Sequence, residues 1–314
     1  MIDNPLAGRF DHLWLSLLNW YAENKRELPW RTTRDPYAIL VSETMLQQTG
    51  VERVIPKYVA FLAELPTLES LAQAPTGAVI RLWAGLGYNR RAVWLQRAAQ
   101  EAIQRWGGLP SSIADLQLLP GIGPYTARAV ACFAFAAQVA VIDTNVRRVL
   151  RRVLAGAGGN GDGAASLPEG QLLALAERVL PPGCAYDWNQ ALMDLGATIC
   201  THHAPRCLSC PLQSSCLAYP AILAQGAHIQ SSVAEAKPRW KESPFVGSRR
   251  YYRGRIVDEL RRLVPGSVIP LIDLGALIKD DFSAADLPWL HDLVQELAAD
   301  GLARIGDEGC VALP

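Results

Sequence analysis

Four of the seven cysteines of this 314-residue chain fall within one short segment. Cys200, Cys207, Cys210 and Cys216 are separated by six, two and five residues. Four soft thiolates in one loop can surround a single metal centre, and such sites suit iron–sulfur clusters or zinc. Zinc sites usually consist of two CxxC-like pairs, whereas this segment has a single CxxC pair with unequal arms. The spacing favours an iron–sulfur cluster, with zinc or no metal as the alternatives.

Two carboxylates lie in settings that suit acid–base chemistry. Glu43 sits among the apolar residues of segment 39–46, where burial would raise its pKa and make it a proton donor at neutral pH. Asp143 lies between an apolar run and a basic helix. An acid and an anion beside a developing cationic sugar are what cleavage of an N-glycosidic bond requires. Glu43 as a surface charge and Asp143 as a helix N-cap are the purely structural alternatives.

The segment LPGIGPYT at 119–126 contains a Gly-x-Gly turn that opens a helix. Gly121 and Gly123 let the backbone approach a phosphate, and free N–H groups at the start of the helix can bind it. The turn lies between two helical segments, which is the layout of a helix-hairpin-helix that grips a DNA backbone without reading bases. A tight turn between two core helices is the alternative.

A mostly helical fold must position these residues. Half of the residues are apolar, and long alternations of Val and Ile are scarce. Pro and Gly turns divide the chain into short helical segments. We predict helices at 9–25, 37–48, 51–64, 67–73, 76–84, 89–106, 112–118, 124–136, from about 144, 168–180 and 187–199.

The C-terminal part of the chain has a different pattern. The polar stretch 225–248 has no clear period and is predicted to be a linker. Residues 249–314 contain three helical patterns and then two short strands about a turn, which is the outline of a winged helix. We therefore predict a region 1–224 that includes the cysteine loop at 200–216, a linker at 225–248, and a small α+β module at 249–314.

Overall charge gives no indication of a nucleic-acid partner, because the formal net charge is zero. A DNA-binding face must come from local clusters at 90–91, 147–152 or 249–262, each of which also fits a solvated helix face. No apolar stretch of about 18 residues lacks charge, and residues 1–14 carry no signal pattern. We expect a protein of the cytoplasm, associated with the nucleoid, that does not enter a membrane.

A set of motifs occurs in a fixed order along residues 9–220. They are LPW at 28–30, SETMLQQT at 42–49, GLGYNRRA at 85–92, LPGIGPYTARAVACFAF at 119–135, VIDTNVRRV at 141–149, NQALMDLGATIC at 189–200 and the four cysteines. This ordered set resembles the adenine DNA glycosylase, or MutY-type, branch of the endonuclease III superfamily. The resemblance implies an all-α, two-lobed helix-hairpin-helix glycosylase fold over 1–224 with an iron–sulfur cluster loop, followed by the winged-helix-like module.

The resemblance implies catalytic roles for four residues. Glu43 matches the acid that protonates adenine at N7, and Asp143 matches the carboxylate that stabilises the oxocarbenium-like sugar. Tyr125 and Asn145 match residues that support these two carboxylates. Lyase members of the superfamily have a lysine at the position of Tyr125, so its absence implies a monofunctional glycosylase that leaves an abasic site.

Further matches imply contacts with DNA and a cofactor. Gln48 and Tyr88 match residues that wedge into the base stack as the base is flipped, with Thr49 and Leu86 beside the opposing base. Positions around the adenine pocket are matched by Arg26, Trp30, Arg31 and Gln190. The ligands of a [4Fe–4S] cluster that shapes a DNA-contacting loop are matched by Cys200, Cys207, Cys210 and Cys216.

The implied function is excision of adenine mispaired with 8-oxoguanine or guanine in double-stranded DNA, by a monomer. Many family members end in a Nudix-like domain, whereas the tail of this chain resembles the shorter tail of actinobacterial-type members. A thymine or uracil glycosylase acting opposite guanine is the first alternative, and the run Gln47-Gln48-Thr49 favours adenine over it. A DNA-binding regulator with a cluster as sensor is the second, and two catalytic carboxylates argue against it.

Overall fold

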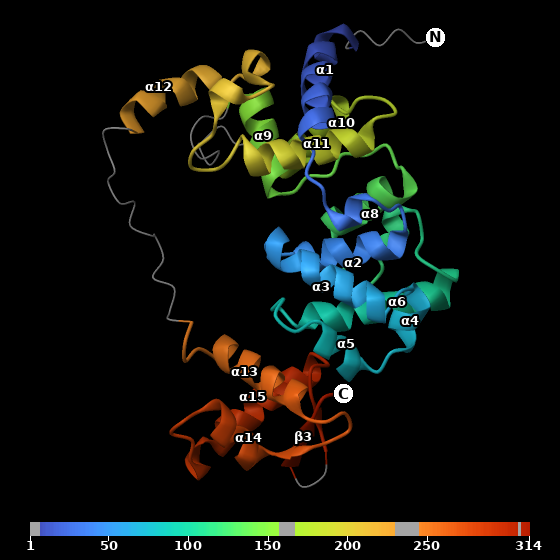
Figure 1. The fold of residues 1–314 in the computed structure, drawn as a ribbon, viewed down its shortest axis with the longest axis vertical. Coiled ribbons are helices and arrows are strands. Elements are labelled where there is room, and N and C mark those ends of the chain that lie inside the picture. The colour runs from blue at the N-terminus through green and yellow to red at the C-terminus, as the bar shows by residue number, and fades with distance from the viewer. Residues whose placement is uncertain (1–6, 157–166, 230–244, 307–308) are drawn as a thin grey trace. The chain divides into compact units, whose positions relative to one another are not determined.

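The computed structural model describes residues 7–156, 167–229, 245–306 and 309–314 (Figure 1). Contacts divide the chain into two compact units, and each unit is assembled from two separate stretches. The first unit comprises residues 1–36 and 124–236, and the second comprises 37–123 and 237–314. Both units are mainly helical, which confirms the predicted fold class. None of the helices in the described ranges is long and apolar enough to cross a membrane.

The first unit is organised around one helix, α11, which packs against both α1 and α9. Close approach of α9 and α11 depends on Gly196, since a Cβ atom there would lie 2.7 Å from Cβ of Asn145. The elements of this unit are α1 (Ala7–Asn24), η1 (Pro29–Arg31), α8 (Pro124–Phe135), α9 (Thr144–Ala155), α10 (Glu169–Arg178), α11 (Ala185–Thr198), η2 (Cys207–Ser209), η3 (Gln213–Ser215) and α12 (Tyr219–Ile229).

The second unit begins with a helix that is buried on all sides. Residues 37–45 of α2 are all buried, and they include the polar side chains of Ser42, Glu43 and Thr44 among apolar ones. Helix α6 ends at Gly107, which adopts the left-handed conformation that suits a helix C-terminus. The helices of this part are α2 (Pro36–Leu46), α3 (Val51–Glu64), α4 (Leu68–Gln73), α5 (Thr76–Leu82), α6 (Arg90–Trp106) and α7 (Ile113–Leu116).

The C-terminal module completes the second unit. It contains three helices and a small antiparallel sheet, and two of the helices lie between β1 and β2 in the chain. The strand order is β1-β3-β2, and Val311 of β3 pairs with Ile269 and Ile305. The predicted helices and the strand pair are confirmed, and β1 is an additional strand. The elements are α13 (Arg249–Arg262), β1 (Ile269–Pro270), α14 (Leu271–Ile278), η4 (Ala284–Asp286), α15 (Leu287–Ala299), β2 (Arg304–Ile305) and β3 (Cys310–Ala312).

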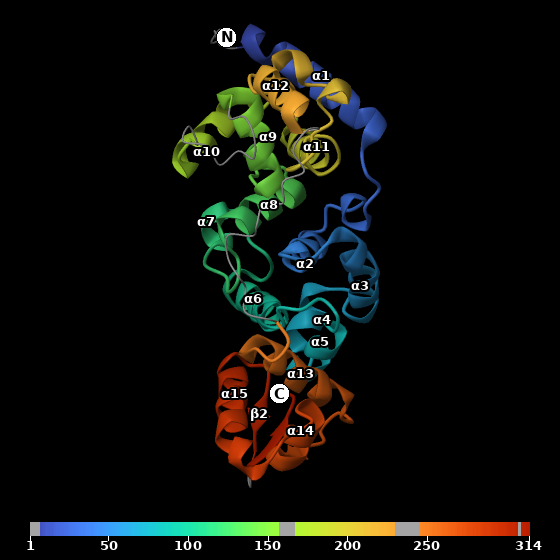
Figure 2. The same ribbon diagram turned by 90° about the vertical axis from the view of Figure 1, so that its left-hand side faces the viewer.

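The module shares its hydrophobic core with α5 and α6. Ile80 and Val93 belong to the same cluster of buried side chains as Ile256, Leu260 and the inner faces of α14 and α15. Figure 2 shows α13 next to α5, in agreement with their direct contacts. The module is therefore packed onto the helices that precede it in this unit.

The helix boundaries agree with the prediction to within a few residues, with one exception. Helix α12, which follows the cysteine loop and ends at Ile229, was not predicted and takes up the first residues of the proposed linker at 225–248. Residues 230–244 of that linker lie outside the described residues. Ser248, at its end, is the N-cap of α13 and accepts a hydrogen bond from the Tyr251 N–H.

Substitution of two glycines of the module by alanine should change its stability in opposite directions. A Cβ atom on Gly275 in α14 would overlap the ring of Phe282, so Gly275→Ala should lower the stability of the module by about 1–3 kcal/mol. Gly254, inside α13, has nothing within 4 Å of its Cβ position. Gly254→Ala should raise stability by roughly 0.5–1 kcal/mol through helix propensity. Thermal unfolding of the full chain measures both, and equal shifts would contradict the packing described here.

Candidate active site and cysteine pocket

Asp143 is the N-cap of α9, and its carboxylate is held at both oxygens. Oδ1 accepts a hydrogen bond from the Val146 N–H at 2.6 Å, and Oδ2 accepts one from the Asn145 side-chain amide at 3.1 Å. The expected contact between Asp143 and Asn145 is therefore present. The N-cap alternative is also correct, because one carboxylate oxygen caps the helix while the group as a whole remains partly exposed.

A chain of hydrogen bonds links Asn145 to the start of the cysteine loop. Arg148 Nη2 donates to Asn145 Oδ1 at 2.8 Å and to the Gly196 carbonyl at 2.7 Å. Its Nε donates to the Cys200 carbonyl at 2.8 Å. The pKa of Arg148 is lowered by burial. The position of the Asp143 carboxylate thus depends on the backbone beside Cys200.

A second polar cluster holds the segment around Trp30. Asp194 on α11 is fully buried and accepts hydrogen bonds from Arg26 Nε at 2.6 Å and from two nitrogens of Arg31 at 2.8 Å. Burial alone would raise the pKa of Asp194, but the hydrogen bonds and charges of Arg31 and then Arg26 outweigh it and lower the pKa. Trp30, between these arginines, and Gln190, on α11, are both buried.

Asp194 was not among the residues predicted from the sequence to belong to the site. A charged residue within the otherwise apolar stretch of α11 was the available signal, since a buried carboxylate needs cationic partners. The two arginines that were predicted to surround an adenine pocket are the partners of this carboxylate.

Glu43 lies on α2 in the second unit, with only 6% of its surface exposed. Glu43 is therefore buried among apolar neighbours, which is the condition under which it was predicted to be a proton donor. The alternative, that Glu43 is a surface charge, is wrong. Asp143, Asn145 and Tyr125 belong to the first unit. Tyr125 is the second residue of α8 and is half-buried.

The two residues expected to wedge into DNA share an unusual backbone conformation. Gln48 and Tyr88 have φ values of 55° and 45°, in the left-handed region that non-glycine residues rarely adopt. Both side chains are exposed, Tyr88 to 53%. Strained backbone of this kind persists only where the surrounding structure enforces it, and it concentrates at functional sites.

Arg91 is the side chain that enforces both turns. It is buried, and its guanidinium donates to seven oxygen atoms of the segments that carry Gln48 and Tyr88. These are the carbonyl oxygens of Thr44, Met45, Gln47, Leu86, Gly87 and Tyr88 and the hydroxyl oxygen of Thr49, at 2.6 to 3.4 Å. Burial lowers the pKa of Arg91 to about 10. Because this value is still well above neutral pH, the guanidinium stays protonated.

The same arginine brings Thr49 and Leu86 together. The Thr49 hydroxyl donates to the Leu86 carbonyl at 3.2 Å, and both groups contact Arg91. The Leu86 side chain itself is only 2% exposed. In the sequence, Arg91 was noted as part of the basic cluster at 90–91, which also fitted a solvated helix face. That alternative is wrong for Arg91, because its side chain is buried.

The Gly-x-Gly turn lies between α7 and α8 in the chain. Leu119–Ile122 forms a β-turn with a hydrogen bond from the Ile122 N–H to the Leu119 carbonyl, with Pro120 and then Gly121 at its centre. Gly121 has a φ of +75°, and a Cβ atom there would lie 2.8 Å from Cβ of Trp94, so glycine is required. Gly123 is exposed and has open space around it.

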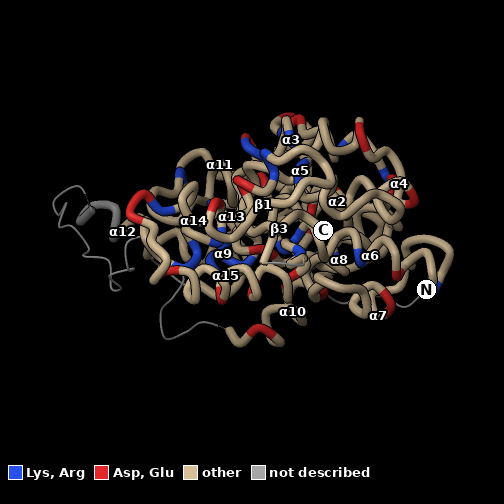
Figure 3. The backbone as a smooth tube through the Cα atoms, turned by 90° about the horizontal axis from the view of Figure 1, so that it is seen from below, with Lys and Arg blue, Asp and Glu red and all other residues tan. Residues whose placement is uncertain are grey.

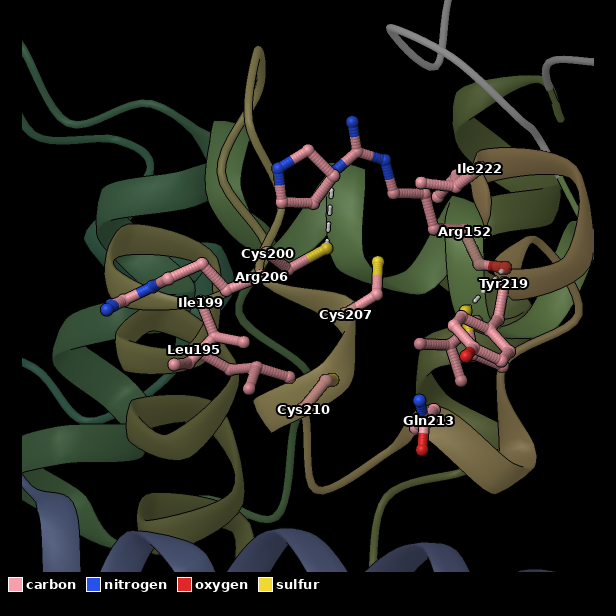
Figure 4. A pocket seen from close by; sticks show the side chains of 13 residues that line it. Arg152, Leu195, Ile199, Cys200, Arg206, Cys207, Cys210, Gln213, Tyr219 and Ile222 are labelled. Carbon is pink, nitrogen blue, oxygen red and sulfur yellow. Dashed lines mark hydrogen bonds between the residues drawn. The ribbon is translucent and has the colours of Figure 1, made fainter. Parts of the chain in front are cut away.

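The four clustered cysteines line one pocket, together with Arg152 and apolar side chains such as Leu195 and Ile199 (Figure 4). Arg152 Nη1 donates to Cys200 Sγ at 3.3 Å, and Cys216 Sγ donates to the Arg152 carbonyl at 3.6 Å. None of these cysteines forms a disulfide.

The donor set of this pocket fits a bound cationic group. Burial raises the pKa of Cys210 to about 12, the neighbouring thiols add to the rise, and burial also raises the pKa values of Cys207 and Cys216. A raised pKa means that burial disfavours the thiolate form. Four clustered thiolates would therefore need a compensating positive centre. Within the described ranges, no group of three or more metal-binding side chains is arranged around a single metal ion. An iron–sulfur cluster at these cysteines therefore stays a prediction.

Comparison with known proteins agrees with this fold. Residues 41–163 match the HhH-GPD superfamily of base excision DNA repair proteins. The adenine DNA glycosylase of Mycolicibacterium smegmatis is 39% identical over 308 residues, covering 95% of each chain. The human adenine DNA glycosylase is 46% identical over 214 residues, which are 65% of this chain and 38% of the human protein.

Two solved structures have the same fold over about two thirds of the chain. A thermostable thymine-DNA glycosylase superposes with a TM-score of 0.60 at 31% identity, over 67% of this chain and 95% of that one. Endonuclease III in a trapped covalent complex with DNA gives 0.58 at 20% identity, over 69% and 98%. The second likeness concerns the fold alone.

The chain is therefore a helix-hairpin-helix protein of base excision DNA repair. Within this superfamily it belongs to the adenine DNA glycosylases. The family, the fold class and the kind of enzyme that the sequence predicted are confirmed.

Replacing Arg91 tests whether it holds both turns. Arg91→Met should lower the free energy of unfolding by roughly 3 kcal/mol, because carbonyl groups lose their donors in a buried setting. Arg91→Lys, with fewer donors, should give an intermediate loss. Arg105→Met, on the exposed face of the same helix, should change stability by less than about 0.5 kcal/mol. Denaturant unfolding measures all three, and a loss for Arg91→Met no larger than the control's would refute this role.

Proposed function

We propose that the chain is a monomeric, monofunctional glycosylase that hydrolyses the N-glycosidic bond of adenine mispaired with 8-oxoguanine or guanine in double-stranded DNA. The observation that carries the proposal is the 39% identity with an adenine DNA glycosylase along nearly the whole of both chains. The buried Glu43 and the anchored Asp143 supply the acid and the anion that the reaction needs.

The proposed reaction begins with DNA bound and the adenine extruded from the stack. Gln48 and Tyr88, both exposed and strained, fill the space that the base leaves, which offsets part of the cost of flipping. The turn at Gly121 and Gly123 offers backbone N–H groups to a phosphate. Basic and acidic positions are interspersed along the backbone (Figure 3), so contact with the DNA backbone depends on such local sites.

Bond cleavage then uses the two carboxylates in different protonation states. Glu43 donates its proton to adenine N7, which makes the base a neutral leaving group as the bond between N9 and C1′ breaks. The Asp143 carboxylate, whose oxygens accept the Val146 N–H and the Asn145 amide, stabilises the positive charge on the sugar. Water adds to C1′ and leaves an abasic site. A tyrosine at position 125 provides no amine to cleave the strand.

We further propose that Cys200, Cys207, Cys210 and Cys216 hold a [4Fe–4S] cluster. When bound, the cluster organises the loop and takes no part in hydrolysis. The hydrogen bonds of Arg148 to the Cys200 carbonyl and to Asn145 would carry its effect on the loop toward Asp143. The cluster thus supports the position of the anion.

A thymine glycosylase acting opposite guanine is the second candidate, because a protein of that kind shares the fold at 31% identity. Single-turnover reactions on duplexes with A opposite 8-oxoguanine, A opposite guanine and T opposite guanine separate the two. Strong cleavage of the first duplex, appearing only after alkaline treatment, supports a monofunctional adenine glycosylase. Preferential cleavage of the third would replace it with the second candidate.

Glu43→Gln should reduce single-turnover excision by at least about 100-fold, because the amide keeps the shape of the side chain but has no acidic proton. Binding of the mispaired duplex should change little. Glu64→Gln, an exposed position at the end of α3, is the matched control and should excise at the wild-type rate. Parallel gel-shift and excision assays measure both properties. A loss of binding as large as the loss of excision would count against the proton-donor role.

Cys210→Ser should greatly reduce bound iron and sulfide and lower the melting temperature, since one of four ligands to the proposed cluster is removed. Cys184→Ser serves as the control, because this exposed cysteine lies outside the pocket. Iron and sulfide analysis together with the visible absorption spectrum of anaerobically purified protein gives the result. Protein from both variants with the same iron content as wild type would exclude Cys210 as a ligand.

A further inference from the structure

The C-terminal module contacts the turn that carries Tyr88 through a buried arginine. Arg261, at the end of α13, has a side chain only 8% exposed. Its Nη2 donates to Asn89 Oδ1 at 2.9 Å and its Nε donates to the Ile80 carbonyl at 2.9 Å. The third nitrogen, Nη1, pairs with Asp258 at 2.7 Å. One guanidinium thus connects the module to both α5 and the start of α6.

Two further links join the same elements. Arg81 of α5 donates to the carbonyls of Leu263 and Arg261, at 2.8 and 3.3 Å. Arg90, in the first turn of α6, pairs with Asp300 of the module at 3.2 Å. Because the apolar core is also continuous across this junction, the module and the helices on either side of the turn form one packed body.

Asn89 is placed where such a link can control the wedge. It directly follows Tyr88 and is the N-cap of α6, but its side chain makes no capping hydrogen bond and faces Arg261 instead. The turn before it is strained at Tyr88, whose φ is positive, whereas Gly85 and Gly87 adopt positive φ without strain. Arg91 holds the inner side of this turn, and Arg261 holds its C-terminal end.

Three other arginines of α13, Arg249, Arg253 and Arg255, bind partners within the module. Glu296 of α15 pairs with Arg249 and Arg253, and Arg253 also pairs with Asp300. Arg255 donates to the Leu277 carbonyl. Acidic residues also outnumber basic ones over residues 249–314. This charge distribution does not favour the module as a reader of DNA phosphates.

We infer that the C-terminal module is a brace for the Gly85–Asn89 turn, with Arg261 as the positioning residue that fixes Tyr88 for insertion into DNA. The inference rests on the proposed function and deepens it, because it gives the module a part in base flipping. The module acts through the protein and makes no contact with DNA in this role. Its coupling to the reaction passes through Asn89.

A double-mutant cycle on the full chain tests the brace. Arg261→Met, Asn89→Ala and the double variant are compared with wild type in single-turnover excision from A opposite 8-oxoguanine, at a temperature well below every melting point. Flipping is followed by the fluorescence of 2-aminopurine placed at the mispaired position. Arg262→Met is the matched control, since this neighbour on α13 is 73% exposed and pairs only with Glu259 among the described contacts.

Each single variant should slow excision and reduce the flipping signal about tenfold, and the double variant should be no worse than either single one. Losses of excision rate that add up in the double variant would overturn the inference that the module braces the turn. Unchanged base flipping in Arg261→Met, while wild-type protein excises adenine, would overturn it as well. Equal losses in Arg261→Met and Arg262→Met would show that α13 acts by its charge on DNA and would also overturn it. Wild-type protein that leaves adenine intact would remove the proposed function itself, and the inference with it.

Discussion

Buried arginine side chains supply the hydrogen bonds that short helices lack. Every α-helix ends with carbonyl groups that have no partner within the helix, and a fold of many short helices has many such ends. Arg91 donates to carbonyls at the end of α2, Arg148 to one at the end of α11, and Arg261 to one at the end of α5. The guanidinium is suited to this task because it presents five donors in a planar fork.

This arrangement connects the fold to the proposed chemistry. Three of the residues expected to act on DNA lie directly beyond helix ends, where the chain turns. Gln48 follows α2 and Tyr88 precedes α6, while Asp143 caps α9. An arginine that satisfies the carbonyls of such an end also fixes the turn beside it. Stability and positioning of the site are therefore obtained from the same hydrogen bonds.

Local sequence predicted the elements and the residues with characteristic motifs. Apolar periodicity and the Pro and Gly breaks placed the helices closely, because these signals act within a few residues, as at the Pro120–Gly121 turn. The apolar neighbours of Glu43 indicated its burial correctly. Resemblance supplied the roles of the site residues, which composition and spacing did not.

Partners distant in sequence were not predictable in this way. Asp194 binds Arg26 across 168 residues, and Arg261 reaches Asn89 across 172. Nothing in the local sequence of either arginine indicates such a partner, and a basic residue on a helix is usually solvated. The burial of Arg91 and Arg152 among runs of basic residues shows how that usual rule fails when backbone carbonyls need donors.

The order of the two units along the chain delays the folding of the first unit during synthesis. The first unit contains α1 but is completed only by residues that follow position 124, after most of the second unit has been made. Helix α1 packs on α11, so its apolar face has no native partner until about residue 198 has emerged. At roughly 5–20 residues per second, that interval is about ten seconds or more. A newly made chain therefore leaves Leu13 and Leu17 of α1 without their native contacts over this interval, whereas the C-terminal module follows α5 and α6, against which it packs, and can fold on them as soon as it is released.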